Sequence, residues 1–239
     1  MLRSFAIRVA TSAGLTAALT VGLVAVAIPV GAVPASKGTT NASLITGLGF
    51  PFGTALSGSK LFVANGSSGT VGEYTTSGTT INASLITGLT DPGAIAVSGT
   101  KVFITSGSGG TVSEYTTSGA PVNTSLISGL ADPDGIAVSG THLFVASFNA
   151  GTVGEYTTSG TAIKSSLIKG IGGPVSIAVS GTLLFVDNHL GTVGEYTTSG
   201  GTVNATLAGG LNSPAGLAVS GKELFVADNG LGTVGEYSI

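Results

Sequence analysis

The sequence predicts an all-β fold, a five-bladed β-propeller with four-stranded blades, and two features of the chain carry this prediction. The first is a tripeptide Gly-Glu-Tyr that recurs around five glutamates, with Ser113 in place of the glycine in the second copy: Glu73, Glu114, Glu155, Glu195 and Glu236. The spacings are 41, 41, 40 and 41 residues, and a fixed period of this length is typical of repeat architectures. The second feature is that each copy divides into four short apolar runs.

The third copy illustrates these four runs. They are Thr124–Ile127, Gly135–Val138, Leu143–Ala146 and Thr152–Tyr156. Val, Ile, Phe, Tyr and Thr within the runs favour pleated sheet, whereas the segments between them are rich in Gly, Pro, Asn and Asp, which form turns. No helical stripe is present outside the N-terminal segment. We therefore expect four strands in each repeat.

The third of these runs, Leu143–Ala146, does not alternate between apolar and polar residues. A strand of this kind is buried on both faces, which suits a sheet packed between two other sheets, as a propeller blade is. The strand before it carries small residues at matched positions, which would let five blades converge near an axis: Ala55, Ala96, Ala137, Ala178 and Ala218. A single repeat cannot bury both of its faces, so the repeats must pack together.

The two ends of the repeat region are out of phase. The region opens with a lone strand of the fourth type, Asn41–Leu48, and it closes with strands of the first three types, ending at Tyr237. Each type of strand then occurs five times. The sequence predicts that the N-terminal strand completes the last blade and closes the ring, which also removes exposed sheet edges.

Residues 1–35 form a different kind of segment. Two arginines near the start precede an uncharged stretch, Val9–Val33, and Val33-Pro34-Ala35 matches a small-x-small cleavage site. This is the layout of a secretory signal peptide, which we expect to be helical and separate from a propeller of residues 36–239. The alternative is an uncleaved membrane anchor, since the stretch is long enough to span a bilayer. Either reading predicts a secreted, periplasmic or cell-surface protein.

The composition excludes several classes of partner. The formal net charge is −3 and charged residues make up 8% of the chain, so there is no basic patch to attract nucleic acid. The absence of cysteine excludes disulfides and thiol chemistry. We expect a monomer that meets a membrane only through an uncleaved leader.

Three segments of the third copy match a known repeat pattern: Pro133–Val138, Leu143–Ala146 and Gly151–Tyr156. Through them, residues 41–239 resemble the NHL-repeat propellers and the broader group that contains streptogramin lyases and SMP-30-type lactonases. The resemblance implies a β-propeller. In the enzymes of the group it places the site on the face made by the loops from the fourth strand to the first and from the second to the third. NHL rings usually have six blades, so five is a departure from the family pattern.

The copies differ most in these two sets of loops. Our candidate ligand-binding face consists of the polar residues found there: Asp132, Asp134, Asp187, Asn188, His189, Asp228 and Asn229. The differences fit a specialised site, and they fit loop drift equally well.

Catalytic chemistry has few candidates on this face. The lyase-like mechanism that the resemblance implies needs a metal and a histidine base. His142 is expected in an exposed turn, whereas His189 lies beside Asp187 on the candidate face. A lactonase-like site needs a divalent ion, and Asp187 and Asp228, each followed by asparagine, supply the hard oxygen atoms that Ca or Mg prefers. The alternative is that these side chains cap their own loops. We assign no catalytic residue and no cofactor, with Ca or Mg as the ion to test.

The sequence therefore favours an exported, non-catalytic propeller that binds a carbohydrate, cell-wall or protein ligand. The alternative is a metal-dependent hydrolase or lyase, and a purely structural role is the third hypothesis. The five glutamates of the repeated tripeptide fall on third strands, away from the axis, so we interpret that tripeptide as framework.

Overall fold

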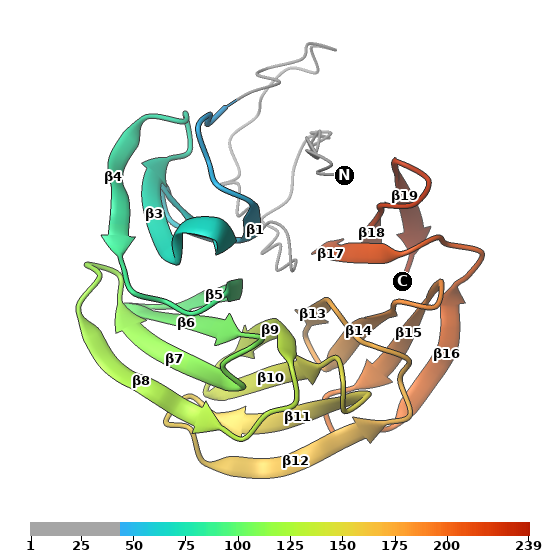
Figure 1. Ribbon diagram of the computed structural model, residues 1–239. Helices are drawn as coiled ribbons and strands as arrows, with labels where there is room; N and C mark the ends of the chain where they lie inside the picture. Colours follow the sequence, from blue (N-terminus) through green and yellow to red (C-terminus); the bar gives the residue numbers. More distant parts are fainter. Residues whose placement is uncertain (1–43) are drawn as a thin grey trace.

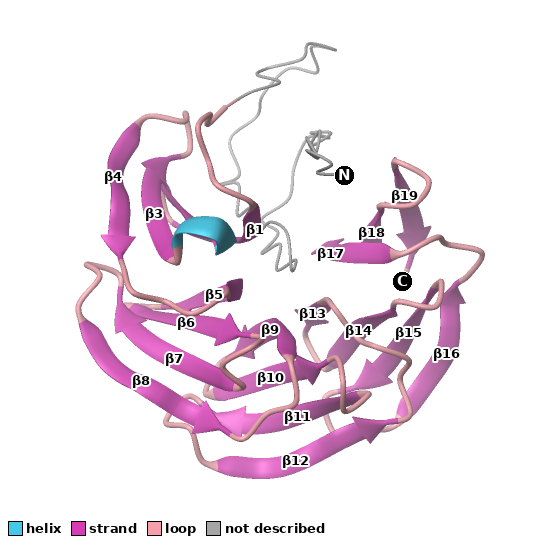
Figure 2. Cartoon of the chain, in the orientation of Figure 1, coloured by secondary structure: helices cyan, strands magenta, loops and turns pink. Residues whose placement is uncertain are grey.

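The structure is a computed structural model that describes residues 44–239. The predicted leader and the first residues of the predicted N-terminal strand lie outside this range. The described chain is a five-bladed β-propeller, and Figures 1 and 2 show its five sheets arranged around a common centre. No helix within residues 44–239 is long and apolar enough to cross a membrane.

Each blade is a sheet of consecutive strands. Blade 1 contains β1 (Pro51–Ser57), β2 (Lys60–Asn65), the 3-10 helix η1 (Gly66–Ser68), β3 (Thr70–Thr75) and β4 (Thr80–Ile86). Blade 2 contains β5 (Pro92–Ser98), β6 (Lys101–Ser106), β7 (Thr111–Thr116) and β8 (Pro121–Ser128). Blade 3 contains β9 (Pro133–Ser139), β10 (His142–Ser147), β11 (Thr152–Thr157) and β12 (Ala162–Lys169). Blade 4 contains β13 (Ile177–Ser180), β14 (Leu183–Asn188), β15 (Thr192–Thr197) and β16 (Thr202–Ala208). Blade 5 contains β17 (Pro214–Ser220), β18 (Glu223–Asp228) and β19 (Thr233–Ser238).

The strands of each blade pair antiparallel in chain order. The prediction of four short strands per repeat is confirmed for blades 1 to 4, with strands one to four residues longer than the apolar runs suggested. The first strand of each blade lies innermost and β4, β8, β12 and β16 form the rim (Figure 1). The small residues on the inner strands are buried, with exposed fractions of 5% or less: Ala55, Ala96, Ala137, Ala178 and Ala218.

The hydrophobic core lies between blades rather than within one. Four clusters join successive pairs of blades, from blades 1 and 2 to blades 4 and 5. Each cluster contains one phenylalanine from a second strand. These four rings are 0–1% exposed: Phe62, Phe103, Phe144 and Phe185. Burial on both faces of the second strand is therefore confirmed for blades 1 to 4.

The Gly-Glu-Tyr tripeptide has a structural role in these interfaces. A Cβ atom placed on Gly72 would lie 2.6 Å from the ring of Tyr74, so the glycine leaves room for the tyrosine two residues later on the same face of the strand. The glutamate between them is buried and meets a lysine or histidine from the second strand in blades 1 to 3. Two of these contacts are ion pairs, Lys60–Glu73 at 2.5 Å and Lys101–Glu114 at 2.8 Å. In the third, His142 Nδ1 and Glu155 Oε1 lie 2.9 Å apart within hydrogen-bond distance.

Blade 5 differs from the others because its sheet has three strands within the described residues. Residues 44–50, the described part of the predicted closing strand and the loop after it, contain bends and no strand. Successive inner strands contact one another from β1 to β17, but no comparable contact joins β17 to β1 in this range. Closure of the ring therefore stays a prediction.

Candidate functional site

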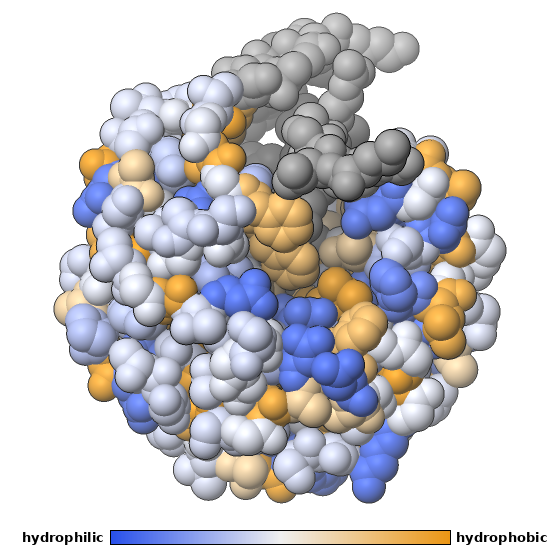
Figure 3. Space-filling view, in the orientation of Figure 1, coloured by the Kyte–Doolittle hydropathy of each residue, from blue (hydrophilic) through white to orange (hydrophobic). Residues whose placement is uncertain are grey.

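One face of the propeller is formed by the loops that leave the fourth strands and those that join second to third strands. The fourth-strand loops of all five repeats pass through the left-handed backbone region at one matched position: Phe50 (φ 53°), Asp91 (φ 48°), Asp132 (φ 58°), Gly173 (φ 64°) and Ser213 (φ 63°). In four of these loops the carbonyl at this position accepts a backbone N–H from the neighbouring loop, for example from Phe148 to Asp132 at 2.8 Å. The repeat thus presents one side chain per blade at the same place. In the view of Figure 3, strongly hydrophilic residues and apolar residues both lie near the centre of this face.

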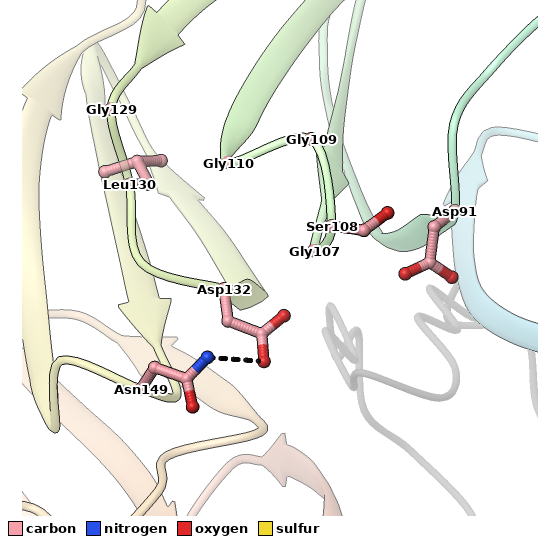
Figure 4. Close-up of a pocket in the computed structure, with 9 residues that line it drawn as sticks. All are labelled: Asp91, Gly107, Ser108, Gly109, Gly110, Gly129, Leu130, Asp132 and Asn149. Carbon is pink, nitrogen blue, oxygen red and sulfur yellow. Dashed lines mark hydrogen bonds between the residues drawn. The ribbon is translucent and has the colours of Figure 1, made fainter.

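The side chains that fill this position in blades 2 and 3 are acidic. Asp91 and Asp132 face each other across an open pocket of about 580 Å³ (Figure 4). Asn149 donates a hydrogen bond to Asp132 Oδ2 at 3.2 Å and so fixes that carboxylate at the edge of the pocket. Of the predicted candidates only Asp132 lines this pocket.

Asp134 adds a third carboxylate close to the same point. A Cβ atom placed on Gly107 would lie 2.8 Å from Asp132 Oδ1, 3.5 Å from Asp91 Oδ2 and 3.7 Å from Asp134 Oδ1. The three carboxyl groups therefore converge on the backbone of Gly107, where any side chain would fill the space between them. Burial raises the pKa of Asp134 to about 7, and the negative charges of Asp132 and Asp91 add to the rise.

Asp187 lies in blade 4 and is fully buried. Its Oδ1 accepts backbone N–H groups from Val175 at 2.8 Å and Ser176 at 2.7 Å, whereas its Oδ2 is buried without a hydrogen-bond partner. Burial raises its pKa to about 8; the two backbone hydrogen bonds oppose the rise, and the charge of Asp134 adds to it. The raised pKa favours the protonated form of Asp187 near neutral pH and links its titration to the charge of Asp134.

The remaining acidic and amide candidates form hydrogen bonds within the loops of their own blade. Asn188 Oδ1 accepts the N–H of Leu190 at 2.8 Å. Asp228 accepts the N–H groups of Asn212 at 2.8 Å and Leu231 at 3.2 Å. The backbone N–H of Asn229 bonds to Ser213. The structure therefore does not bring these residues together with Asp132 and Asp134 in one cluster.

The two histidines lie apart and in different settings. His189 is on the candidate face, where its ring packs edge-on against Phe148 at 5.7 Å and lies 3.3 Å from Ser213 Oγ. His142 was expected in an exposed turn, but it begins β10 and its ring is half-buried against Glu155. Among residues 44–239, no group of three or more His, Cys, Asp or Glu side chains has an arrangement suited to holding a metal ion.

Asp91 and Asn149 belong to the loops that the sequence assigns to this face, but the predicted candidates included neither of them, nor Gly107. The signal for Asp91 was available, because it occupies the position of Asp132 one repeat earlier. The sequence gives no such signal for Gly107, because its importance depends on carboxyl groups from two neighbouring repeats that converge on its backbone.

No family model matches this sequence, and no curated protein matches it. Solved structures with the same fold do. A catalytically inactive virginiamycin B lyase from Staphylococcus aureus, solved with quinupristin, aligns at 18% identity and a TM-score of 0.66. The alignment covers 79% of this chain and 66% of the lyase, just under two thirds of its length. A streptogramin B lyase aligns at 17% identity and a TM-score of 0.59, over 79% and 68% of the two chains. A chain from a nidogen–laminin complex aligns at 16% identity and a TM-score of 0.67, over 79% and 80%. Likeness at this level establishes the propeller fold alone.

Proposed function

We propose that this chain is an exported, monomeric and non-catalytic binding module, whose ligand presents a positive charge to the centre of the candidate face. The convergence of Asp91, Asp132 and Asp134 on Gly107 is the observation that supports this function. The pocket beside them is polar, with Leu130 as its one apolar side chain. An amine-bearing carbohydrate of the cell wall is the first ligand class to test, and a basic protein segment is the second.

The electrostatics of the cluster favour such a ligand. Three carboxyl groups so close together repel one another when ionised, and part of that cost is met by protonation of Asp134. An ammonium group within hydrogen-bond reach would offset the repulsion and allow all three to ionise. Binding should therefore release a proton near neutral pH and weaken as salt concentration rises.

The test is binding of the full chain to an array of cell-wall glycans and basic peptides. We expect the Asp132→Asn variant to lose at least tenfold in affinity for amine-bearing ligands, because it removes one of the three charges. Glu223→Gln is the matched control, since it removes the same charge from the first residue of β18, outside the pocket. Equal binding by the wild type and Asp132→Asn, or no preference for amines, would contradict the proposal.

A metal-dependent hydrolase or lyase is the second candidate, and one observation favours it. The pKa of Asp134 is raised to about 7, in the range that suits a general acid or base, and its carboxyl group lies near those of Asp91 and Asp132. The solved neighbours do not decide between the two functions, because they include both lyases and a chain from a nidogen–laminin complex. Elemental analysis of the purified protein and a thermal shift with Ca²⁺ or Mg²⁺ test this alternative. No bound ion and no shift would contradict it.

We also propose that the repeats are of the NHL type, that residues 1–35 are an export leader, and that the ligand is met at the cell surface or outside the cell. The composition and motif pattern of the sequence support these points. Detection of the tagged chain in the medium or the wall fraction, with a new N-terminus near residue 36, tests the export step.

A further inference from the structure

On the candidate face, the loop between the second and third strands of one blade lies against the fourth-strand loop that enters the next blade. The first residue of one loop and the left-handed residue of the other meet in the same space. Gly107 begins such a loop in blade 2, and a Cβ atom placed on it would lie 2.8 Å from Asp132 Oδ1. The arrangement is reversed one blade later, because a Cβ atom placed on Gly173 would lie 2.8 Å from the ring of Phe148. This space therefore holds a carboxylate between blades 2 and 3 and an aromatic ring between blades 3 and 4.

Phe148 and Leu190 form an apolar patch over the loop that enters blade 4. This loop contains two consecutive glycines, Gly172 and Gly173. A Cβ atom on the first would lie 2.6 Å from the side chain of Leu190, and the second lies under the ring of Phe148. Leu190 is 81% exposed, more than any other large apolar side chain in residues 44–239, and the ring of His189 lies edge-on against that of Phe148 at 5.7 Å. Apolar surface left open beside polar groups is typical of binding sites.

The apolar patch adjoins the carboxylate cluster of Asp91, Asp132 and Asp134 through the loop that carries Phe148. The backbone N–H of Phe148 donates to the carbonyl oxygen of Asp132 at 2.8 Å. The next residue, Asn149, donates through its side chain to Asp132 Oδ2 at 3.2 Å. Phe148 is therefore anchored to the residue whose carboxylate faces Asp91 across the pocket (Figure 4). A ligand that reaches this carboxylate also comes within reach of the patch.

Asp187 connects the two loops of blade 4 that contribute to the patch. It stands two residues before His189, and its Oδ1 accepts the backbone N–H of Val175, two residues after Gly173, at 2.8 Å. Its Oδ2 is buried without a hydrogen-bond partner, and the charge of Asp134 contributes to the rise of its pKa. A cation bound at the carboxylate cluster would favour the ionised form of Asp187. The attraction for a positive group therefore extends from the cluster toward the patch.

We propose that the ligand of this face is a basic peptide segment whose cation binds Asp91 and Asp132 while a neighbouring apolar side chain covers the patch. This inference rests on the proposed function and selects the second of its two ligand classes. The exposed Leu190 decides between them, because an amino sugar offers an amine to the carboxylates but has no alkyl or aromatic side chain to cover a leucine. Side chains two residues apart in an extended peptide point the same way, so one short segment can reach both parts of the site.

Titration calorimetry of the full chain with three blocked tripeptides tests this proposal. The first peptide is acetyl-Lys-Gly-Phe-amide. The second, acetyl-Lys-Gly-Ser-amide, lacks the apolar group, and the third, acetyl-norleucine-Gly-Phe-amide, lacks the charge. An oligomer of glucosamine represents the amine-bearing carbohydrates. We expect the first peptide to bind about tenfold more tightly than each of the other three probes, because it alone fills both the acidic and the apolar parts of the site.

The Leu190→Ser variant separates the apolar part of the site from the acidic part. Its exposed side chain makes it a change that the fold tolerates. The variant should lose most of the preference for the Phe peptide over the Ser peptide, and its affinity for the Ser peptide should stay that of the wild type. Val122→Ser is the matched control, since Val122 is a 56% exposed apolar residue of the rim strand β8. It should leave all four affinities unchanged.

The possible failures of this proposal and of the proposed function give different results. Equal affinities of the two lysine peptides, an unchanged preference in Leu190→Ser, or tighter binding of the glucosamine oligomer would overturn this inference and leave the proposed function standing. Equal affinities of the norleucine peptide and acetyl-Lys-Gly-Phe-amide would overturn both, because the carboxylates would then take no part in binding. Absence of binding by every amine-bearing probe would also overturn both.

Discussion

Replacement of Asp187 by asparagine should make the protein more stable at alkaline pH and reduce the dependence of its stability on pH. Burial raises the pKa of this carboxyl from 3.8 to about 8 in the folded protein. The folded state therefore holds a proton that the unfolded chain releases between these two values. The contribution of this proton to stability is complete below about pH 4 and is lost as the pH rises through about 8. Asparagine keeps an oxygen to accept the N–H groups of Val175 and Ser176, but it cannot ionise.

The size of the effect follows from the shift in pKa. Four units correspond to about 6 kcal/mol at about 1.4 kcal/mol per unit, which is an upper limit because an ionised carboxylate draws in water or local rearrangement. We expect about 3 kcal/mol between pH 5 and pH 9 in the wild type. Asp134, whose pKa is raised to about 7, also makes the free energy of unfolding fall as the pH rises. This second fall is complete at a lower pH than that of Asp187, and it remains in the Asp187→Asn variant.

Urea unfolding followed by far-UV circular dichroism at pH 5, 7 and 9 measures these differences. The free energy of unfolding of the wild type should fall across the series, and that of Asp187→Asn should fall less, so that the variant is the more stable protein at pH 9. Parallel curves for the two proteins would refute the reasoning, because they would show that Asp187 ionises alike in the folded and unfolded states.

Three further predictions concern the repeated framework, and urea midpoints check each of them. Gly151→Ala should lower the free energy of unfolding by about 3 kcal/mol or more, because its φ is +62° and an added Cβ would lie 2.5 Å from a backbone carbonyl oxygen. Gly140→Ala, at φ +58° with nothing near the added Cβ, should lower it by about 1 kcal/mol. Equal costs would contradict the role of close packing. Phe144→Ala should cost about 3–5 kcal/mol because the ring is 1% exposed within an interblade core. Lys101→Met should cost about 1 kcal/mol, and less at high salt, because it leaves Glu114 buried without its partner; a cost independent of salt would argue against the ion pair.

The sequence was sufficient to predict the fold because the same pattern of apolar runs and turn residues recurs five times. Turn residues fix where strands end, and a strand such as β10 that is apolar on both sides can only lie between two sheets. The matched alanines of the inner strands indicated where the blades converge, and they are buried there. These signals are local, and each repeat confirms the reading of the others.

The site was harder to predict because it depends on contacts between repeats. Asp187 and Asp228 both follow an apolar strand and both precede asparagine, so they look alike in sequence. In the structure Asp228 accepts N–H groups from the loops of blade 5, whereas Asp187 is fully buried and one of its oxygens has no hydrogen-bond partner. The two aspartates occupy repeat positions that differ by one residue. Asp228 aligns with Asn188, whereas Asp187 aligns with Ala146. Only alignment of the strands, followed by knowledge of which side chains face the axis, separates them.

The propeller fold does not require the carboxyl group of Asp187 in blade 4. Blades 1, 3 and 5 have alanine where Asp187 stands, and they pair their first strands with their second along more of their length than β13, which spans only Ile177–Ser180. In blade 4 the side chain of Asp187 takes the N–H groups of Val175 and Ser176, so a carboxyl group replaces part of the backbone ladder. Burying such a group costs stability that the alanine blades do not lose. Three of the other repeats have alanine at this position, which avoids this cost. The departure from alanine at Asp187, whose pKa is also raised by the charge of Asp134, therefore supports the proposed ligand-binding role of this face and not a requirement of the fold.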